Sequence, residues 1–106
     1  MGRVAYVFKI KPELKNEYKR IHDDIWPELK KAIRDCGQRN YSLFFRKGGT
    51  IFAYLETDDF EGGNEKLNNM DISIRWEKMM DKYFVKDDDT ALGPEMEILE
   101  EVWHLD

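Results

Sequence analysis

The sequence predicts an α+β domain whose elements follow the order β, α, β, β, α, β. An alternating apolar pattern opens the chain, two aromatic strands joined by a glycine-rich turn lie in its middle, and stretches of helical periodicity flank that pair. This order is the ferredoxin-like split βαβ arrangement, in which right-handed crossovers place both helices on one face of an antiparallel sheet. With 106 residues, the chain is expected to form a single domain over residues 1–106.

The first half predicts a strand and a long, interrupted helix. Apolar side chains alternate with others from Arg3 to Ile10, a period of two that is typical of a strand. Apolar residues then recur at helical spacing from Leu14 to Ile33. Pro27 lies inside that run, where it removes a backbone donor and disfavours helical geometry at Trp26. We therefore expect a kink or a break at this point.

The second half predicts a hairpin, a broken helix and a last strand. Tyr41–Arg46 and Ile51–Glu56 are short aromatic and aliphatic runs, and the glycine-rich turn between them is of hairpin type. Helical periodicity follows from Asp59 to Tyr83, and a pair of glycines weakens its beginning. Glu97–His104 is expected to be the final strand, because apolar side chains occupy both of its faces in alternation.

The predicted hairpin strands carry large apolar side chains on both faces. Leu43 and Phe45 alternate with Phe44 in one strand, and Leu55 shares the other strand with Phe52 on the opposite face. Helices on one side of the sheet leave such a second face exposed, and large exposed apolar patches usually mark an interface or a binding groove. The pattern therefore predicts either a homodimer through the sheet faces or a sheet face that forms a ligand cleft.

The composition argues against several partners and locations. The formal net charge is -5 at pH 7 and no basic stripe offsets it, so nucleic acid is not an expected partner. The single cysteine, Cys36, cannot form an internal disulfide and has no zinc-ligand pattern beside it, which favours a reducing cytoplasm. The chain opens on a strand pattern and has no long apolar run, so we expect neither a signal sequence nor a membrane span.

The sequence also lacks the motifs of common cofactor and nucleophile chemistries. It contains no P-loop, no dinucleotide glycine fingerprint and no serine nucleophile elbow. Phosphoryl, hydride and acyl transfer are therefore not expected, and proton chemistry without a cofactor or a metal remains. Near neutral pH such chemistry most readily uses histidine, because imidazole has an unperturbed pKa of about 6.5.

His22 is the stronger of two candidate histidines, since His104 is more simply explained as a polar residue near the chain end. On a continuous helix Tyr18, His22 and Trp26 would form one ridge at the flank of the buried stripe. A histidine there is either a proton-transfer group at a cleft edge or a boundary residue bonded to a neighbour. The sequence leaves the roles of Trp26 and Trp76 undecided as well, because each could stack on the C–H face of a sugar or belong to the core.

Residues 17–29, EYKRIHDDIWPEL, closely resemble the EYxRxHxxIWPEL segment of the L-rhamnose mutarotase family. The resemblance extends along nearly the whole chain. It implies a dimeric α+β barrel of ferredoxin-like subunits that interconverts the α and β anomers of a monosaccharide, L-rhamnose or a related deoxy sugar. It further implies that His22 is the proton donor and that Tyr18, Tyr41 and Trp76 line the sugar site.

One position departs from the family pattern. The family commonly has a second tryptophan directly after the one that matches Trp76, and this chain has Glu77 there. A carboxylate accepts hydrogen bonds from hydroxyls, so Glu77 is expected to contact the sugar and could shift the sugar preference. Two alternatives remain, a cofactor-independent monooxygenase of the same architecture and a non-catalytic sugar-binding module, and neither requires the EYxRxHxxIWPEL segment.

Overall fold

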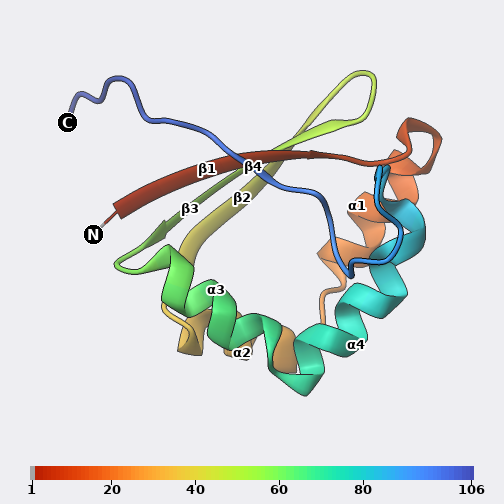
Figure 1. Cartoon of the computed structure of the whole chain (residues 1–106), viewed down its shortest axis with the longest axis horizontal. Coiled ribbons are helices and arrows are strands. Elements are labelled where there is room, and N and C mark those ends of the chain that lie inside the picture. Colours follow the sequence, from red (N-terminus) through yellow and green to blue (C-terminus); the bar gives the residue numbers. More distant parts are fainter. Residues whose placement is uncertain (1) are drawn as a thin grey trace.

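The chain folds as one antiparallel sheet with all of its helices on one face (Figure 1). The computed structural model describes residues 2–106. The strands, in the spatial order β2–β3–β1–β4, are β1 (Gly2–Lys9), β2 (Arg39–Arg46), β3 (Thr50–Thr57) and β4 (Glu97–Ile98). The helices are α1 (Lys15–Asp23), α2 (Pro27–Asp35), α3 (Phe60–Asn68) and α4 (Asp71–Met80), with short 3-10 turns at Pro12–Leu14 and Asp81–Tyr83. The predicted ferredoxin-like order is confirmed, and each crossover contains two helices.

The break in the first crossover falls where the proline predicted it. Trp26 has an extended backbone, with φ −59° and ψ 131°, and Pro27 begins α2. Proline suits a first helical position because its missing N–H would be unpaired there in any case. The chain therefore turns between α1 and α2, and α1 ends at Asp23, one residue after His22.

The second crossover is broken into two helices, as the sequence predicted. Gly62 and Gly63 both lie inside α3, whose start is capped by the Asp59 side chain accepting from the Gly62 N–H at 3.0 Å. A Cβ at Gly63 would stand 2.5 Å from the Cys36 carbonyl oxygen, so this glycine allows α3 to approach the end of α2. The break falls at Met70, which is extended with ψ 137°.

The prediction of a long last strand is wrong. Only Glu97–Ile98 pairs with β1, extended by a hydrogen bond from the Leu99 N–H to the Ala5 carbonyl at 2.9 Å. Alternating apolar residues describe an extended chain, but they supply no backbone partner, and the chain beyond residue 99 has no further ladder with β1. Val102 and Trp103 are 83% and 76% exposed.

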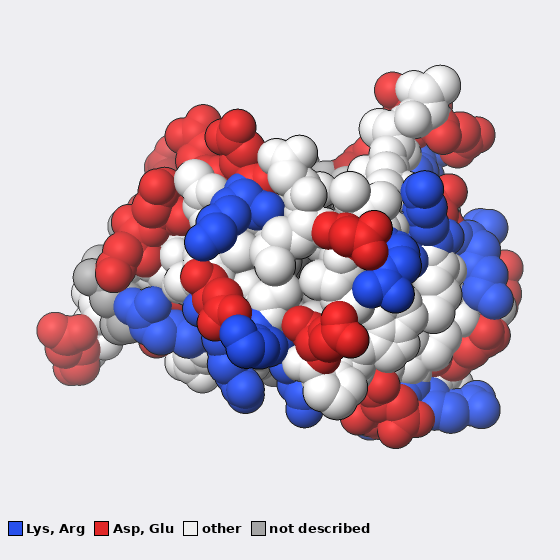
Figure 2. Space-filling model, turned by 90° about the horizontal axis from the view of Figure 1, so that it is seen from below, with Lys and Arg blue, Asp and Glu red and all other residues white. Residues whose placement is uncertain are grey.

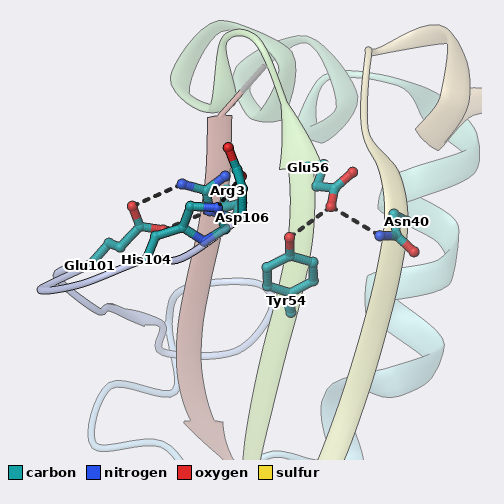
Figure 3. Close-up of polar contacts among 7 residues, drawn as sticks. All are labelled: Arg3, Asn40, Tyr54, Glu56, Glu101, His104 and Asp106. Atoms are coloured by element: carbon teal, nitrogen blue, oxygen red, sulfur yellow. Dashed lines mark hydrogen bonds and ion pairs between the residues drawn. The ribbon is translucent and has the colours of Figure 1, made fainter.

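Beyond residue 99, the contact with β1 that the described residues show is one exposed ion pair, and a second polar contact lies within this C-terminal segment. The Arg3 guanidinium donates to the Glu101 carboxylate at 2.8 Å, and His104 lies 2.7 Å from the Asp106 carboxylate (Figure 3). Solvent-exposed ion pairs of this kind contribute little to stability. The segment therefore adds almost nothing to the core of this chain.

The hydrophobic core lies between the sheet and the helices. Its most deeply buried side chains include Ile10, Leu55, Met80 and Tyr83. The opposite face of the sheet, here called the outer face, carries Val7, Phe52 and Phe44, which are partners in the strand register. Phe52 is 37% exposed and Phe44 is 61% exposed, so the described chain leaves this aromatic row uncovered.

The described residues include no helix that is long and apolar enough to span a membrane. On the face in Figure 2, acidic and basic side chains are interspersed and do not form a continuous basic stripe. A nucleic-acid surface would need positive charge gathered along the phosphate path, and the face in Figure 2 has no such gathering.

Candidate active site

A cavity of about 1110 Å³ lies between the sheet and the helices. Its wall includes every candidate site residue that the sequence predicted except one: Tyr18 and His22 from α1, Tyr41 from β2, and Trp76 and Glu77 from α4. Residues 92–94 and Met96, in the connection to β4, complete the wall on one side. An apolar cavity with a few convergent polar groups is the usual form of a small-molecule site.

Trp26 is the exception, because it lies outside the wall of this cavity. Its ring stands edge-on to Trp76, with the centroids 5.1 Å apart, and lines a separate small depression with Arg20 and Met79. Spacing on a continuous helix had placed Trp26 on the ridge of His22. The break before Pro27 ends that helix at Asp23, so the ridge stops at His22 and Trp26 instead supports Trp76.

The orientation of His22 is set by its own helix. Its Nδ1 lies 3.0 Å from the Tyr18 carbonyl oxygen, and its ring is 4.4 Å from the Tyr18 ring and 5.5 Å from Trp76. A carbonyl oxygen can only accept, so Nδ1 donates and carries the ring proton in the neutral form. Burial lowers the pKa of His22, with the Tyr18 carbonyl and Asp23 opposing that shift. At neutral pH the ring is therefore mainly uncharged, with Nε2 free to accept a proton.

Two tyrosine hydroxyls meet in the cavity. Tyr6 on β1 and Tyr41 on β2 are hydrogen-bonded to each other through their side-chain oxygens. Burial raises the pKa of both hydroxyls, and the nearby Glu77 carboxylate adds to each shift. Sequence reasoning missed Tyr6, because an aromatic residue in an alternating strand carries the same signal whether its hydroxyl is used or not.

Glu77 is a partly buried carboxyl group without a local partner. Its Oε2 is fully buried and has no hydrogen-bond partner among residues 2–106. Burial raises the pKa of Glu77 to about 7, Asp81 adds to the shift and Lys86 opposes it. Gly93 lies against this oxygen, since a Cβ there would be 3.1 Å from it. The cavity thus contains an acid that is partly protonated at neutral pH.

The chemical capacity of the cavity comes from these groups together. A neutral imidazole can accept a proton through Nε2, a protonated carboxyl can donate one, and hydroxyls can position polar substrate groups. No group of three or more His, Cys, Asp or Glu residues that could hold a metal ion occurs in the part of the chain that the structure describes.

A family model described as L-rhamnose mutarotase matches residues 3–105 of this chain. The chain belongs to the L-rhamnose mutarotase family. An L-rhamnose mutarotase of Listeria monocytogenes serovar 1/2a is 41% identical to it over 81 residues, which make up 76% of this chain and 77% of the relative. Membership in this family, which the EYxRxHxxIWPEL segment had indicated, is thereby confirmed.

Solved structures agree with the observed fold. The crystal structure of an L-rhamnose mutarotase from Formosa agariphila matches with a TM-score of 0.86 at 30% identity and covers 100% of both chains. A dimeric ferredoxin-like protein from an uncultured marine organism matches with a TM-score of 0.63, covering 98% of each chain. At 13% identity, the second likeness concerns the fold alone.

Proposed function

We propose that this member of the L-rhamnose mutarotase family interconverts the α and β anomers of L-rhamnose, or of a closely related deoxy sugar, with the sugar bound beside His22. The observation that carries the proposal is the position of His22, whose Nδ1 is bonded to its own helix while its ring lies in the wall of an aromatic cavity. Family membership favours this activity over the monooxygenase and the non-catalytic binding module.

The reaction needs only proton transfers. The anomeric hydroxyl loses a proton and the ring oxygen gains one, so the bond between C1 and the ring oxygen breaks and an aldehyde forms. Rotation about C1–C2 followed by reclosure gives the other anomer. In this scheme Nε2 of His22 accepts the proton of the anomeric hydroxyl, and the resulting imidazolium returns it when the ring closes. His22 thus acts as base and as proton donor in successive half-reactions.

The other cavity residues bind and orient the sugar. Trp76 offers an aromatic surface for the C–H groups of the ring, while the paired hydroxyls of Tyr6 and Tyr41, with Tyr18, offer hydrogen bonds to sugar hydroxyls. A fixed orientation converts a bimolecular proton transfer into an effectively intramolecular one. The entropy cost of bringing the groups together is then met when the sugar binds, and this lowers the barrier of the chemical step.

Saturation-transfer NMR of the anomeric protons tests this function directly. The protein is expected to accelerate exchange between the α and β anomers of L-rhamnose, and to act less on sugars that differ in ring configuration. L-fucose serves as the matched comparison because it is also a six-deoxy sugar. An exchange rate equal to that of the sugar alone, for every sugar tried, would reject the proposed activity.

We also propose that the protein is a homodimer whose subunits pack through the outer faces of their sheets. The support is the uncovered row formed by Val7, Phe52 and Phe44, together with the exposed apolar side chains of Val102 and Trp103. Burying such surface gains about 25 cal/mol per Å² of apolar area. Obligate homodimer interfaces are more apolar than other interfaces, and the aromatic row supplies apolar side chains for one.

Phe52→Glu is expected to convert the dimer into monomers at micromolar concentration in sedimentation velocity. The side chain lies in the middle of the outer face and outside the cavity wall, so the change would place a charge in each half of a symmetric interface without altering the site. Unchanged far-UV circular dichroism would show that the subunit still folds. A wild-type protein that sediments only as a monomer would contradict the proposal.

A further inference from the structure

Anomer exchange requires proton transfer at two different oxygens of the sugar. The bond between Nδ1 of His22 and the Tyr18 carbonyl occupies one ring nitrogen, so only Nε2 can exchange a proton with the substrate. One nitrogen cannot serve the anomeric oxygen and the ring oxygen in the same step. If His22 accepts the proton of the anomeric hydroxyl, a second group must supply the ring oxygen.

The tyrosines of the cavity are poorly suited to that transfer. The hydroxyls of Tyr6 and Tyr41 are hydrogen-bonded to each other, and burial raises the pKa of both. Burial likewise raises the pKa of Tyr18. These hydroxyls can orient the sugar, but an efficient acid has a pKa near the working pH.

Glu77 differs from them in geometry. It lies in the same cavity wall, one residue after Trp76, whose ring contacts His22. Its Oε2 is buried and has no hydrogen-bond partner among the described residues, although a buried polar atom normally has one. The carboxyl group therefore has hydrogen-bonding capacity that the described residues do not use.

We propose that Glu77 is the second proton-transfer group of the site, donating to the ring oxygen while His22 accepts the proton of the anomeric hydroxyl. The proposal rests on the mutarotase function above. In ring opening, the Glu77 O–H proton passes to the ring oxygen, the bond from that oxygen to C1 breaks, and the anomeric O–H electrons form the aldehyde carbonyl as its proton moves to Nε2. Reclosure returns both protons, so no other reactant is consumed.

The electrostatic surroundings of Glu77 maintain the acid form. The groups that face it are Asp81 after α4, Lys86 in the following connection, and the hydroxyls of Tyr6, Tyr18 and Tyr41. Lys86 is the cation of this set, and its Nζ donates to Asp81 at 2.7 Å and to the Ala91 carbonyl at 2.5 Å. Since the ammonium is engaged there, burial dominates and raises the pKa of Glu77 to about 7.

The pH dependence of exchange tests the assignment. After subtraction of the uncatalysed rate, the wild-type rate on L-rhamnose is expected to fall above about pH 7, by about tenfold per pH unit once the carboxyl is mostly ionised. It is expected to fall on the acid side as well, below the lowered pKa of His22, where Nε2 is already protonated. A wild-type profile without the alkaline fall would overturn the proposal.

Glu77→Gln keeps the shape of the side chain and removes its acidic proton. We expect the rate at pH 7 to fall by about 10²-fold or more and the alkaline limb near pH 7 to disappear, while the acid limb of His22 remains. Wild-type rates in this variant, or a lower rate with an unchanged profile, would overturn the role of Glu77. Carbon-13 NMR titration of the Glu77 carboxyl in the wild-type protein, expected to give a pKa near 7, provides a test independent of the variant.

A second variant changes the surroundings of Glu77 rather than the carboxyl group. Gly93→Ala would place a methyl group 3.1 Å from Oε2 at a backbone φ of +87°, so it is expected to displace the carboxyl and reduce the rate.

Failure of the whole function is distinguishable from failure of this inference. In the first case the wild-type protein does not accelerate exchange, and in the second it does so with the same rate and pH profile after Glu77→Gln.

Discussion

His22→Ala is expected to lower the protein-dependent rate of anomer exchange by about 10²- to 10⁴-fold, the usual contribution of a positioned acid or base. The variant removes the one imidazole in the cavity wall, while the tyrosine hydroxyls remain as groups that bind the sugar. We therefore expect the exchange rate to fall and the binding of the sugar to persist. Saturation-transfer NMR of L-rhamnose measures the rate, and sugar-induced shifts of the protein amide signals measure the binding.

His104→Ala is the matched control for that experiment. It removes the other histidine, which lies in the C-terminal segment, is bonded to Asp106 and is outside the cavity wall. Its exchange rate is expected to equal that of the wild-type protein. If His22→Ala retains the wild-type rate while thermal unfolding shows an intact fold, His22 is not the proton-transfer group. Equal losses in both variants would indicate damage unrelated to the cavity.

The order of elements was predictable because each one has a local signal. The alternation of Arg3–Ile10, the glycine-rich turn of the hairpin and the effect of Pro27 on its neighbours act over a few residues, and all three appear in the structure as expected. The length of the last strand was not predictable in this way. Pairing depends on a partner backbone, and only Glu97–Ile98 has that partner in this chain.

The candidate site was predictable only in part. Residue spacing marked His22 as a residue beside a buried stripe, but it left the choice between a boundary histidine and a proton-transfer group open. The resemblance added Tyr18, Tyr41 and Trp76, and the structure brings these to one cavity with His22. Tyr6 was missed, because no local pattern shows that its hydroxyl meets that of a residue 35 positions away.

Trp76→Ala is expected to destabilise the protein by about 3–5 kcal/mol, the usual loss when a buried tryptophan is truncated. The side chain is 6% exposed, and its ring lies edge-on to both His22 and Trp26. The expected loss includes both the transfer of apolar surface and the volume left unfilled. Urea unfolding followed by far-UV circular dichroism measures this change without depending on tryptophan fluorescence.

Comparing Trp76→Ala with Trp26→Ala separates the two roles of Trp76, as a core side chain and as part of the cavity wall. Trp26 is partly buried, contacts Trp76 and lies outside the wall, so we expect a smaller loss of unfolding free energy and a rate of anomer exchange near that of the wild-type protein. Trp76→Ala, measured where it is still folded, should instead bind L-rhamnose more weakly, because the sugar loses an aromatic surface. Equal sugar binding in the two variants would mean that Trp76 serves the core alone. A stability loss from Trp76→Ala below about 1 kcal/mol would contradict its burial in the packed core.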